Sequence, residues 1–151
     1  MLDEAREGTR VAANAQPTAP TILDAQDIAS TFGDVLAQLP EAPRTFTLYF
    51  RFDSEVLTDE SRLLLDEVRR EVMSRPAPEV TAIGHTDRTG QTNANVQLGL
   101  RRANAVRTLL VVAGLAANAV EVASHGEADP LVPTADGVIE PRNRRVEVTV
   151  R

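Results

Sequence analysis

The chain has 151 residues, enough for one domain and a short additional segment, and 42% of them are hydrophobic while only 3% are aromatic. The core must therefore be mainly aliphatic, and the formal net charge of -6 argues against general binding to nucleic acid or anionic lipid. All 16 basic residues are arginine and cysteine is absent, which excludes lysine Schiff bases, thiolate catalysis, disulfides and cysteine-ligated zinc.

The N-terminal part carries most of the negative charge, with seven acidic residues and three arginines in residues 1–44. Residues 1–23 lack an apolar period and are rich in Ala, Thr, Pro and Asn, so we expect a flexible leader. Residues 24–43 are predicted to form an acidic helix and a linker, with Asp24 as N-cap and Pro40 as stop signal. The helix is indicated by an apolar stripe at Ile28, Phe32, Val35, Leu36 and Leu39.

Residues 44–151 are predicted to form one α/β (α+β) sandwich in which two main helices cover one face of a mixed sheet, in the order βαβαβ-β. The first strand is indicated by the alternating residues Phe46, Leu48, Phe50 and Phe52, all expected on its buried face. A helix capped by Thr58 follows and ends before Pro76. A second strand begins at Val80 and is expected to stop at Gly84.

A second helix is predicted from about Asn93 to Ala113, with Gly114 as its C-cap. Its inner face is expected to carry Leu98, Ala103, Val106, Leu109 and Leu110. A third strand is marked by Val120 and Val122. A long polar loop then leads to the last strand, which is marked by the alternating residues Val146, Val148 and Val150.

The densest polar cluster, residues 84–90, follows the second strand, where folds of this class place ligands. Asn95 and Arg102 lie two turns apart on one face of the following helix. The Asp87 carboxylate and the Arg102 guanidinium could together bind a zwitterion, or they could simply pair with each other. Arg144 either ends the long loop or supplies a second cation to the same pocket.

Two histidines, His85 and His125, are the only ones in the chain. A metal-dependent hydrolase using them with Asp87 is one alternative, but the usual three or four ligands at a known spacing are lacking. Gly-x-Ser-x-Gly and phosphate-loop motifs are also absent. We therefore expect no metal, no cofactor and no enzymatic activity.

These motifs resemble the signature of the OmpA-like C-terminal domain, the peptidoglycan-binding module of outer-membrane OmpA proteins, peptidoglycan-associated lipoprotein and MotB. The resemblance covers about residues 45–151. Its centre is Gly84-His85-Thr86-Asp87-x-x-Gly90-x-x-x-x-Asn95-x-x-Leu98-x-x-x-Arg102-Ala103-x-x-Val106, flanked by Phe50-x-Phe52-Asp53-Ser54-x-x-Leu57-Thr58, Gly126-Glu127-x-x-Pro130 and Asn143-Arg144-Arg145-Val146-Glu147-Val148.

The resemblance implies non-covalent binding of the meso-diaminopimelate of the peptidoglycan stem, which would anchor an envelope protein to the cell wall. Asp87 matches the residue that holds the ligand's ammonium, and Arg102 matches the one that holds its carboxylate. The pocket is expected to be completed by Thr86, Asn95, Asp53 and Arg144.

The chain departs from the family pattern at three positions. Arg51 stands where many members have an acid that contacts the ligand, Gly99 replaces a usual Ser, and Glu140 replaces a frequent Arg. A protein-interaction module of a secretion or motor complex that has lost wall binding is therefore the alternative function.

The resemblance also implies a periplasmic location, associated with the outer membrane or cell wall. The first residues lack the basic and apolar regions of a signal peptide, so membrane attachment is expected only through an anchor upstream of this sequence. A homodimer is left open.

Overall fold

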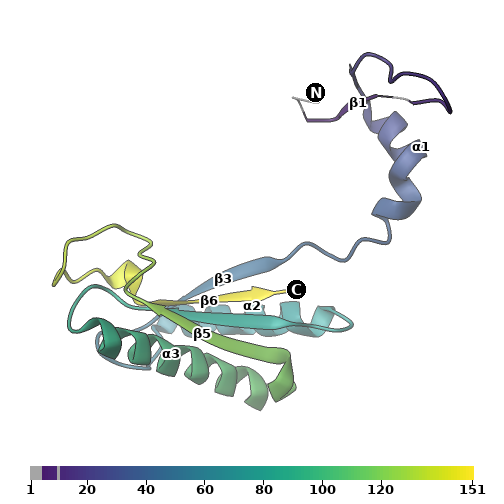
Figure 1. Cartoon of the computed structure of the whole chain (residues 1–151). Coiled ribbons are helices and arrows are strands. Elements are labelled where there is room, and N and C mark those ends of the chain that lie inside the picture. Colours follow the sequence, from purple (N-terminus) through teal and green to yellow (C-terminus); the bar gives the residue numbers. More distant parts are fainter. Residues whose placement is uncertain (1–4, 10) are drawn as a thin grey trace. The chain divides into compact units, whose positions relative to one another are not determined.

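The computed structural model describes residues 5–9 and 11–151, and the chain divides into two units, Met1–Glu41 and Ala42–Arg151 (Figure 1). Part of the predicted leader, residues 1–4 and 10, lies outside the described residues. In the first unit, β1 (Glu7–Gly8) pairs antiparallel with β2 (Thr21–Ile22). The described part of the leader therefore contains one short strand pair, and its flexibility stays a prediction.

The helix of the first unit, α1, spans Ala25–Leu36. Its predicted cap is confirmed, because the Asp24 side chain accepts a hydrogen bond of 2.7 Å from the Asp27 backbone N–H. No residue of α1 is buried, so its predicted apolar stripe remains accessible within this unit.

The second unit contains a four-stranded sheet in the order β3-β6-β4-β5. Its strands are β3 (Arg44–Tyr49), β4 (Val80–His85), β5 (Val120–Gly126) and β6 (Arg145–Val150). The β6 strand runs antiparallel to both β3 and β4, whereas β4 and β5 are parallel. This mixed sheet confirms the predicted fold class.

The position of β6 between β3 and β4 decides where the polar loops meet. Tyr49 at the end of β3 pairs with Arg145 at the start of β6, and Gly84 near the end of β4 pairs with Val146. Because β6 is antiparallel to both neighbours, its beginning lies beside the ends of the other two strands. The loops that follow β3 and β4 and the loop that precedes β6 therefore lie at one edge of the sheet.

Two helices cover one face of the sheet, α2 (Asp59–Ser74) and α3 (Thr92–Val112), with short helical turns at η1 (Ala117–Ala119) and η2 (Pro141–Asn143). Thr58 caps α2 as predicted. The buried core is aliphatic apart from Phe46 and Phe50, and both helices contribute to it, for example through Val68 and Val106. None of the helices in the described part of the chain is long and apolar enough to cross a membrane.

Three details of the core differ from the predictions. Phe52 is 57% exposed, because β3 ends at Tyr49 and Phe52 lies in the turn that follows. Leu109 is 40% exposed and lies off the inner face of α3. The β4 strand does not stop at Gly84 but continues to His85.

Gly84 in β4 and Gly99 in α3 lie at a close contact between the two backbones. A methyl group at Gly84 would overlap the backbone of Gly99 on α3, and one at Gly99 would meet the Gly84 carbonyl oxygen at 2.9 Å. The two glycines therefore let strand and helix backbones approach closely. Gly99 lowers the helix propensity of α3 by about 1 kcal/mol relative to Ala, but a larger residue would not fit at this contact.

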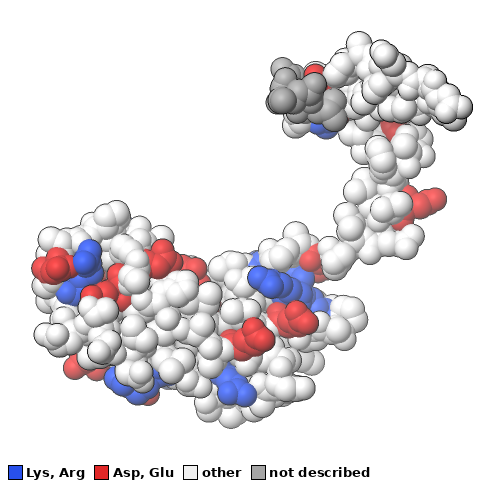
Figure 2. All heavy atoms as spheres, viewed as in Figure 1, with Lys and Arg blue, Asp and Glu red and all other residues white. Residues whose placement is uncertain are grey.

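The charged residues of the second unit are mixed in sign. Figure 2 shows arginine and acidic side chains interspersed over the visible face rather than gathered into one basic surface. Such a distribution lacks the dense positive field that sequence-independent nucleic-acid binding requires.

Candidate functional site

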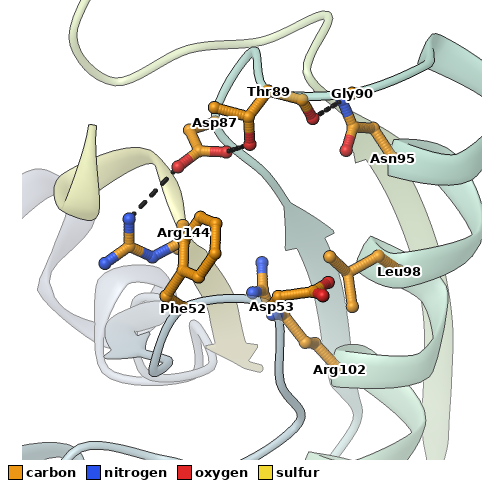
Figure 3. A pocket seen from close by; sticks show the side chains of 9 residues that line it. All are labelled: Phe52, Asp53, Asp87, Thr89, Gly90, Asn95, Leu98, Arg102 and Arg144. Atoms are coloured by element: carbon orange, nitrogen blue, oxygen red, sulfur yellow. Dashed lines mark hydrogen bonds and ion pairs between the residues drawn. The ribbon is translucent and has the colours of Figure 1, made fainter. Parts of the chain in front are cut away.

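A pocket of about 270 Å³ lies at the edge of the sheet where the three loops meet. Residues from four segments line it, and Figure 3 shows their side chains around one space. The lining residues are Phe52, Asp53, Asp87, Thr89, Gly90, Asn95, Leu98, Arg102 and Arg144. Five of the six predicted ligand-binding residues are among them.

Asp87, which follows β4, is the buried anion of the pocket, with only 3% of its surface exposed. One carboxylate oxygen, Oδ2, lies 3.1 Å from the Arg144 Nη1, and the other accepts a 2.6 Å hydrogen bond from the Thr89 hydroxyl. The alternative in which Asp87 pairs with Arg102 is wrong: no ion pair joins these two side chains in the described structure. Asp87 and Arg102 therefore line the same pocket without forming an ion pair with each other.

Arg102 projects from α3 and is fully buried. Its guanidinium donates to three backbone carbonyl oxygens, those of Ser54, His85 and Arg51, at 2.9, 3.2 and 3.4 Å. It also lies 5.5 Å from the ring centre of Phe50. These contacts fix the guanidinium where the loop after β3 and the end of β4 meet.

Burial lowers the pKa of Arg102 to about 10, and the neighbouring Arg144 guanidinium acts in the same direction. The Asp87 and Asp53 carboxylates act in the opposite direction. The side chain is therefore charged at neutral pH. It has no carboxylate partner within ion-pair distance among the described residues, so a carboxylate ligand would supply the missing counter-charge.

Arg144 lies one residue before β6 and fulfils both roles that the sequence left open. It ends the short helix η2, and it lines the pocket as a second cation beside Asp87. Its guanidinium carbon lies 5.5 Å from the ring centre of Phe52. The Arg144 Nε is buried without a hydrogen-bond partner in the described structure.

Asn95 and Asp53 line other parts of the pocket. The Asn95 amide donates to the Thr89 carbonyl oxygen at 3.0 Å and to the Glu127 carboxylate, which ties α3 to the loops after β4 and β5. Asp53 is exposed and has a positive φ of 42°, a conformation that Asp adopts more readily than most residues. The negative charge of its carboxylate acts to raise the pKa of Arg102.

Thr86 is not among the lining residues. It is 1% exposed, its backbone N–H donates to the Gly126 carbonyl at 2.8 Å, and its hydroxyl has no partner in the described structure. Asp87 therefore lines the pocket, whereas Thr86 is buried outside its lining. Thr89, which lines the pocket, was missed, although it lies in the same polar cluster.

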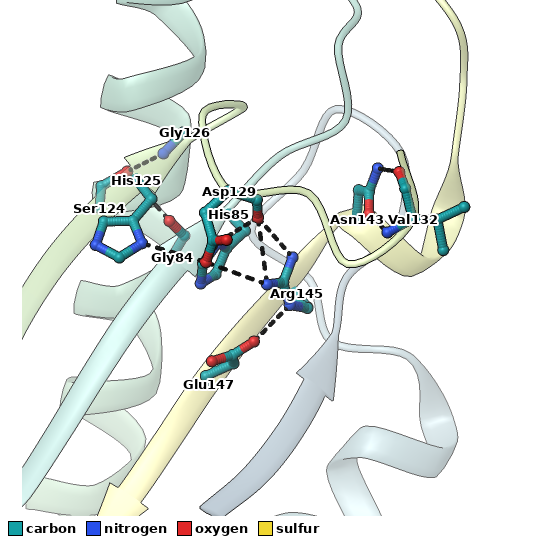
Figure 4. A network of polar contacts seen from close by, with 10 residues as sticks. All are labelled: Gly84, His85, Ser124, His125, Gly126, Asp129, Val132, Asn143, Arg145 and Glu147. Atoms are coloured by element: carbon teal, nitrogen blue, oxygen red, sulfur yellow. Dashed lines mark hydrogen bonds and ion pairs between the residues drawn. The ribbon is translucent and has the colours of Figure 1, made fainter. Parts of the chain in front are cut away.

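A second polar network, drawn in Figure 4, holds the neighbouring loop. The Asn143 side chain is fully buried and exchanges two 2.8 Å hydrogen bonds with the backbone of Val132. Arg145 contacts the Asp129 carbonyl oxygen at 3.3 Å and the Glu147 carboxylate at 2.8 Å. Within the Asn-Arg-Arg motif, only Arg144 therefore lines the pocket, and its neighbours fix the loop.

Both histidines lie beside Asp129 in this network. Atoms of His85, His125 and Asp129 that could bind a metal lie within 4.8 Å of one another. The hydrolase alternative needed Asp87, which Arg144 holds instead. The Arg145 guanidinium lies 3.8 Å from the same Asp129 oxygen that faces both histidines. Because that guanidinium would repel a metal cation, we interpret the cluster as structural.

His85 is expected to make the stability of the domain depend on pH. Burial lowers the pKa of His85, and the Arg145 charge adds to the effect, so the folded domain takes up this proton at a lower pH than the unfolded chain does. The unfolded chain takes up a proton at the ordinary value of about 6.5, so stability present above that pH is lost as pH falls below it. One proton accounts for at most about 1.4 kcal/mol per pH unit.

We expect the unfolding free energy to fall as the pH drops below about 6.5, and His85→Gln to flatten that dependence. Urea denaturation at several pH values measures it. An unchanged slope in the variant would show that other groups cause the dependence.

The fold and this pocket define a mixed α/β domain with a buried acid and two arginines at one edge of its sheet. The OmpA family matches residues 49–144, and the chain belongs to this family.

Individual relatives agree with this assignment. The chain is 36% identical to the peptidoglycan-associated lipoprotein of Haemophilus influenzae over 78% of this chain and 76% of that protein. It is 32% identical to outer membrane protein A of Bordetella avium over 68% of this chain, and the match spans only about half (53%) of that relative's length. The crystal structure of the peptidoglycan-associated lipoprotein from Burkholderia pseudomallei aligns with a TM-score of 0.63 and 30% identity, covering 70% of this chain and 89% of that one.

Proposed function

We propose that residues 42–151 bind peptidoglycan without covalent chemistry, through the meso-diaminopimelate of the peptide stem. The supporting observation is that Asp87 and Arg102 line one pocket without pairing with each other. The free end of stem-linked diaminopimelate carries an ammonium and a carboxylate on one carbon. Asp87 would accept from the ammonium, and the Arg102 guanidinium would bind the carboxylate.

The other pocket residues have subsidiary roles in this proposal. Arg144 holds the Asp87 carboxylate in place, and the apolar surfaces of Phe52 and Leu98 contact the methylene chain of the ligand. Asn95 keeps the loop after β4 against α3. No residue of the pocket is assigned a catalytic step, so the domain would act by binding alone. In this proposal it would do so in the periplasm, at the cell wall.

Asp87→Asn tests this function with little change in shape. The amide keeps a hydrogen-bond acceptor but loses the charge that attracts the ammonium, and we expect affinity for isolated peptidoglycan sacculi to fall at least tenfold. Co-sedimentation with sacculi measures the loss, and free meso-diaminopimelate should compete with the wild-type protein.

The matched control is Asp136→Asn. Asp136 is 84% exposed at its side chain and pairs with Arg88, so the same chemical change is made in a surface ion pair. Equal sedimentation of wild type and Asp87→Asn would contradict the proposal. If the wild type itself does not sediment with sacculi, the alternative remains, a protein-interaction module without wall binding.

A further inference from the structure

A second pocket adjoins the first and has no role in the binding of diaminopimelate proposed above. It has a volume of about 650 Å³ and lies between the end of β3, the start of α2 and the helical turn η2. Phe52 and Arg144 line both pockets, so the two pockets are direct neighbours that share these side chains. A ligand longer than diaminopimelate could extend from one pocket into the other.

The charges of this second pocket favour an anion. Arg51, Arg142 and Arg144 line it, against one acidic residue, Glu60. Two of the arginines are already engaged: Arg142 binds the Glu140 carboxylate through two nitrogens, at 3.1 and 3.2 Å, and Arg144 binds Asp87. Of these three arginines, Arg51 has the weakest side-chain contact.

Among the described residues, the Arg51 side chain is held by a single surface contact. Its side chain is 58% exposed and lies 3.3 Å from Asp59, which is itself 81% exposed. Such a pair contributes little to stability, so exchanging Asp59 for another carboxylate costs little. The pocket also offers an apolar surface, because the ring of Phe52 is 57% exposed.

We propose that Arg51 and this pocket form a second subsite, which binds another carboxylate of the same stem peptide. The inference rests on the proposed function. In the stem, diaminopimelate follows a glutamate that is linked through its side-chain carboxyl, so the α-carboxylate of that glutamate is free. A D-alanine that follows diaminopimelate ends in a second free carboxylate. The planar guanidinium fork suits either group.

The experiment compares ligands that differ in one carboxylate. Calorimetry would measure the affinity of the wild type for free meso-diaminopimelate, for the tripeptide L-Ala-γ-D-Glu-meso-diaminopimelate, and for the same tripeptide with the glutamate α-carboxylate amidated. A tetrapeptide ending in D-alanine, as acid and as amide, tests the other carboxylate. We expect one free acid to bind about tenfold tighter than its amide.

Variants at Arg51 test whether this residue causes the preference for the free acid over the amide. Arg51→Ala should abolish the difference between acid and amide, and Arg51→Glu should reverse it, while both keep their affinity for free meso-diaminopimelate. The control is Arg69→Ala, an exposed arginine about 13 Å further along α2 than Glu60, which should behave as wild type.

The outcomes separate this inference from the proposed function. An acid-over-amide preference that persists in Arg51→Ala, or is absent from the wild type, would overturn the subsite alone. If the wild type binds neither free meso-diaminopimelate nor any stem peptide, the proposed function fails and the subsite with it.

Discussion

Replacing Arg102 with alanine is expected to lower the midpoint of thermal unfolding by more than about 10 °C and to abolish binding of diaminopimelate. The guanidinium is fully buried and connects the loop after β3 to the end of β4. Each hydrogen bond from a charged donor contributes about 1.5–3 kcal/mol, so losing two costs about 3 kcal/mol or more. For a domain of this size, 1 kcal/mol shifts the midpoint by roughly 4–8 °C.

Two further variants separate charge from geometry. Arg102→Lys keeps a positive charge but lacks the fork that reaches several carbonyl oxygens, so we expect an intermediate stability and weak binding. Arg101→Ala removes the preceding arginine, whose side chain is 55% exposed and pairs with Glu55 at 2.8 Å, and it should cost less than about 1 kcal/mol. A wild-type unfolding midpoint in Arg102→Ala would disprove the structural role.

Gly84→Ala should destabilise the domain by about 3 kcal/mol or more, or prevent folding. The added methyl would overlap the carbonyl group of Gly99, which is backbone of α3 and cannot rotate away like a side chain. Overpacking typically costs about 1–3 kcal/mol, and a rigid obstacle places this variant at or above the upper end. Because the same contact holds β4 beside α3, the loop carrying Asp87 should also be displaced.

Urea denaturation measures the loss, and circular dichroism reports whether the variant folds at all. The matched control is Gly33→Ala on α1, where an added methyl meets no atom within 4 Å. It should leave the unfolding of the second unit unchanged. If Gly84→Ala unfolds at the same urea concentration as the wild type, strand and helix are not held together at this close contact.

Local features of the sequence were sufficient for the secondary structure. Asp24 and Thr58 were predicted as N-caps and act as such, because a cap depends on residues three positions apart. The errors arose where the outcome depends on distant segments. Phe52 fits the alternation of the first strand, but β6 pairs only as far as Tyr49, and Phe52 lies in a turn where its ring is exposed.

In the candidate site too, local features were predicted and contacts between distant segments were not. Residue types and helical spacing placed Asp87, Asn95 and Arg102 at one edge of the sheet, and the structure has them lining one pocket. The family resemblance added Asp53, and it favoured the pocket role of Arg144 that the residues alone left open. No local signal could show that Arg144 rather than Arg102 pairs with Asp87, because that depends on the long-range position of β6. Whether the pocket binds diaminopimelate stays a prediction for the sacculus experiment.

The amino-acid sequence predicts an aliphatic mixed α/β domain, the order of its helices and strands, and a polar cluster after the second strand of that domain. These properties follow from periodicity, capping residues and composition, which act over a few residues. Only the tertiary structure decided that β6 lies between β3 and β4, that Gly84 meets Gly99, and that Arg51 faces a second pocket. Those contacts join segments far apart in the chain, and they form because the sheet and both helices must bury one shared core.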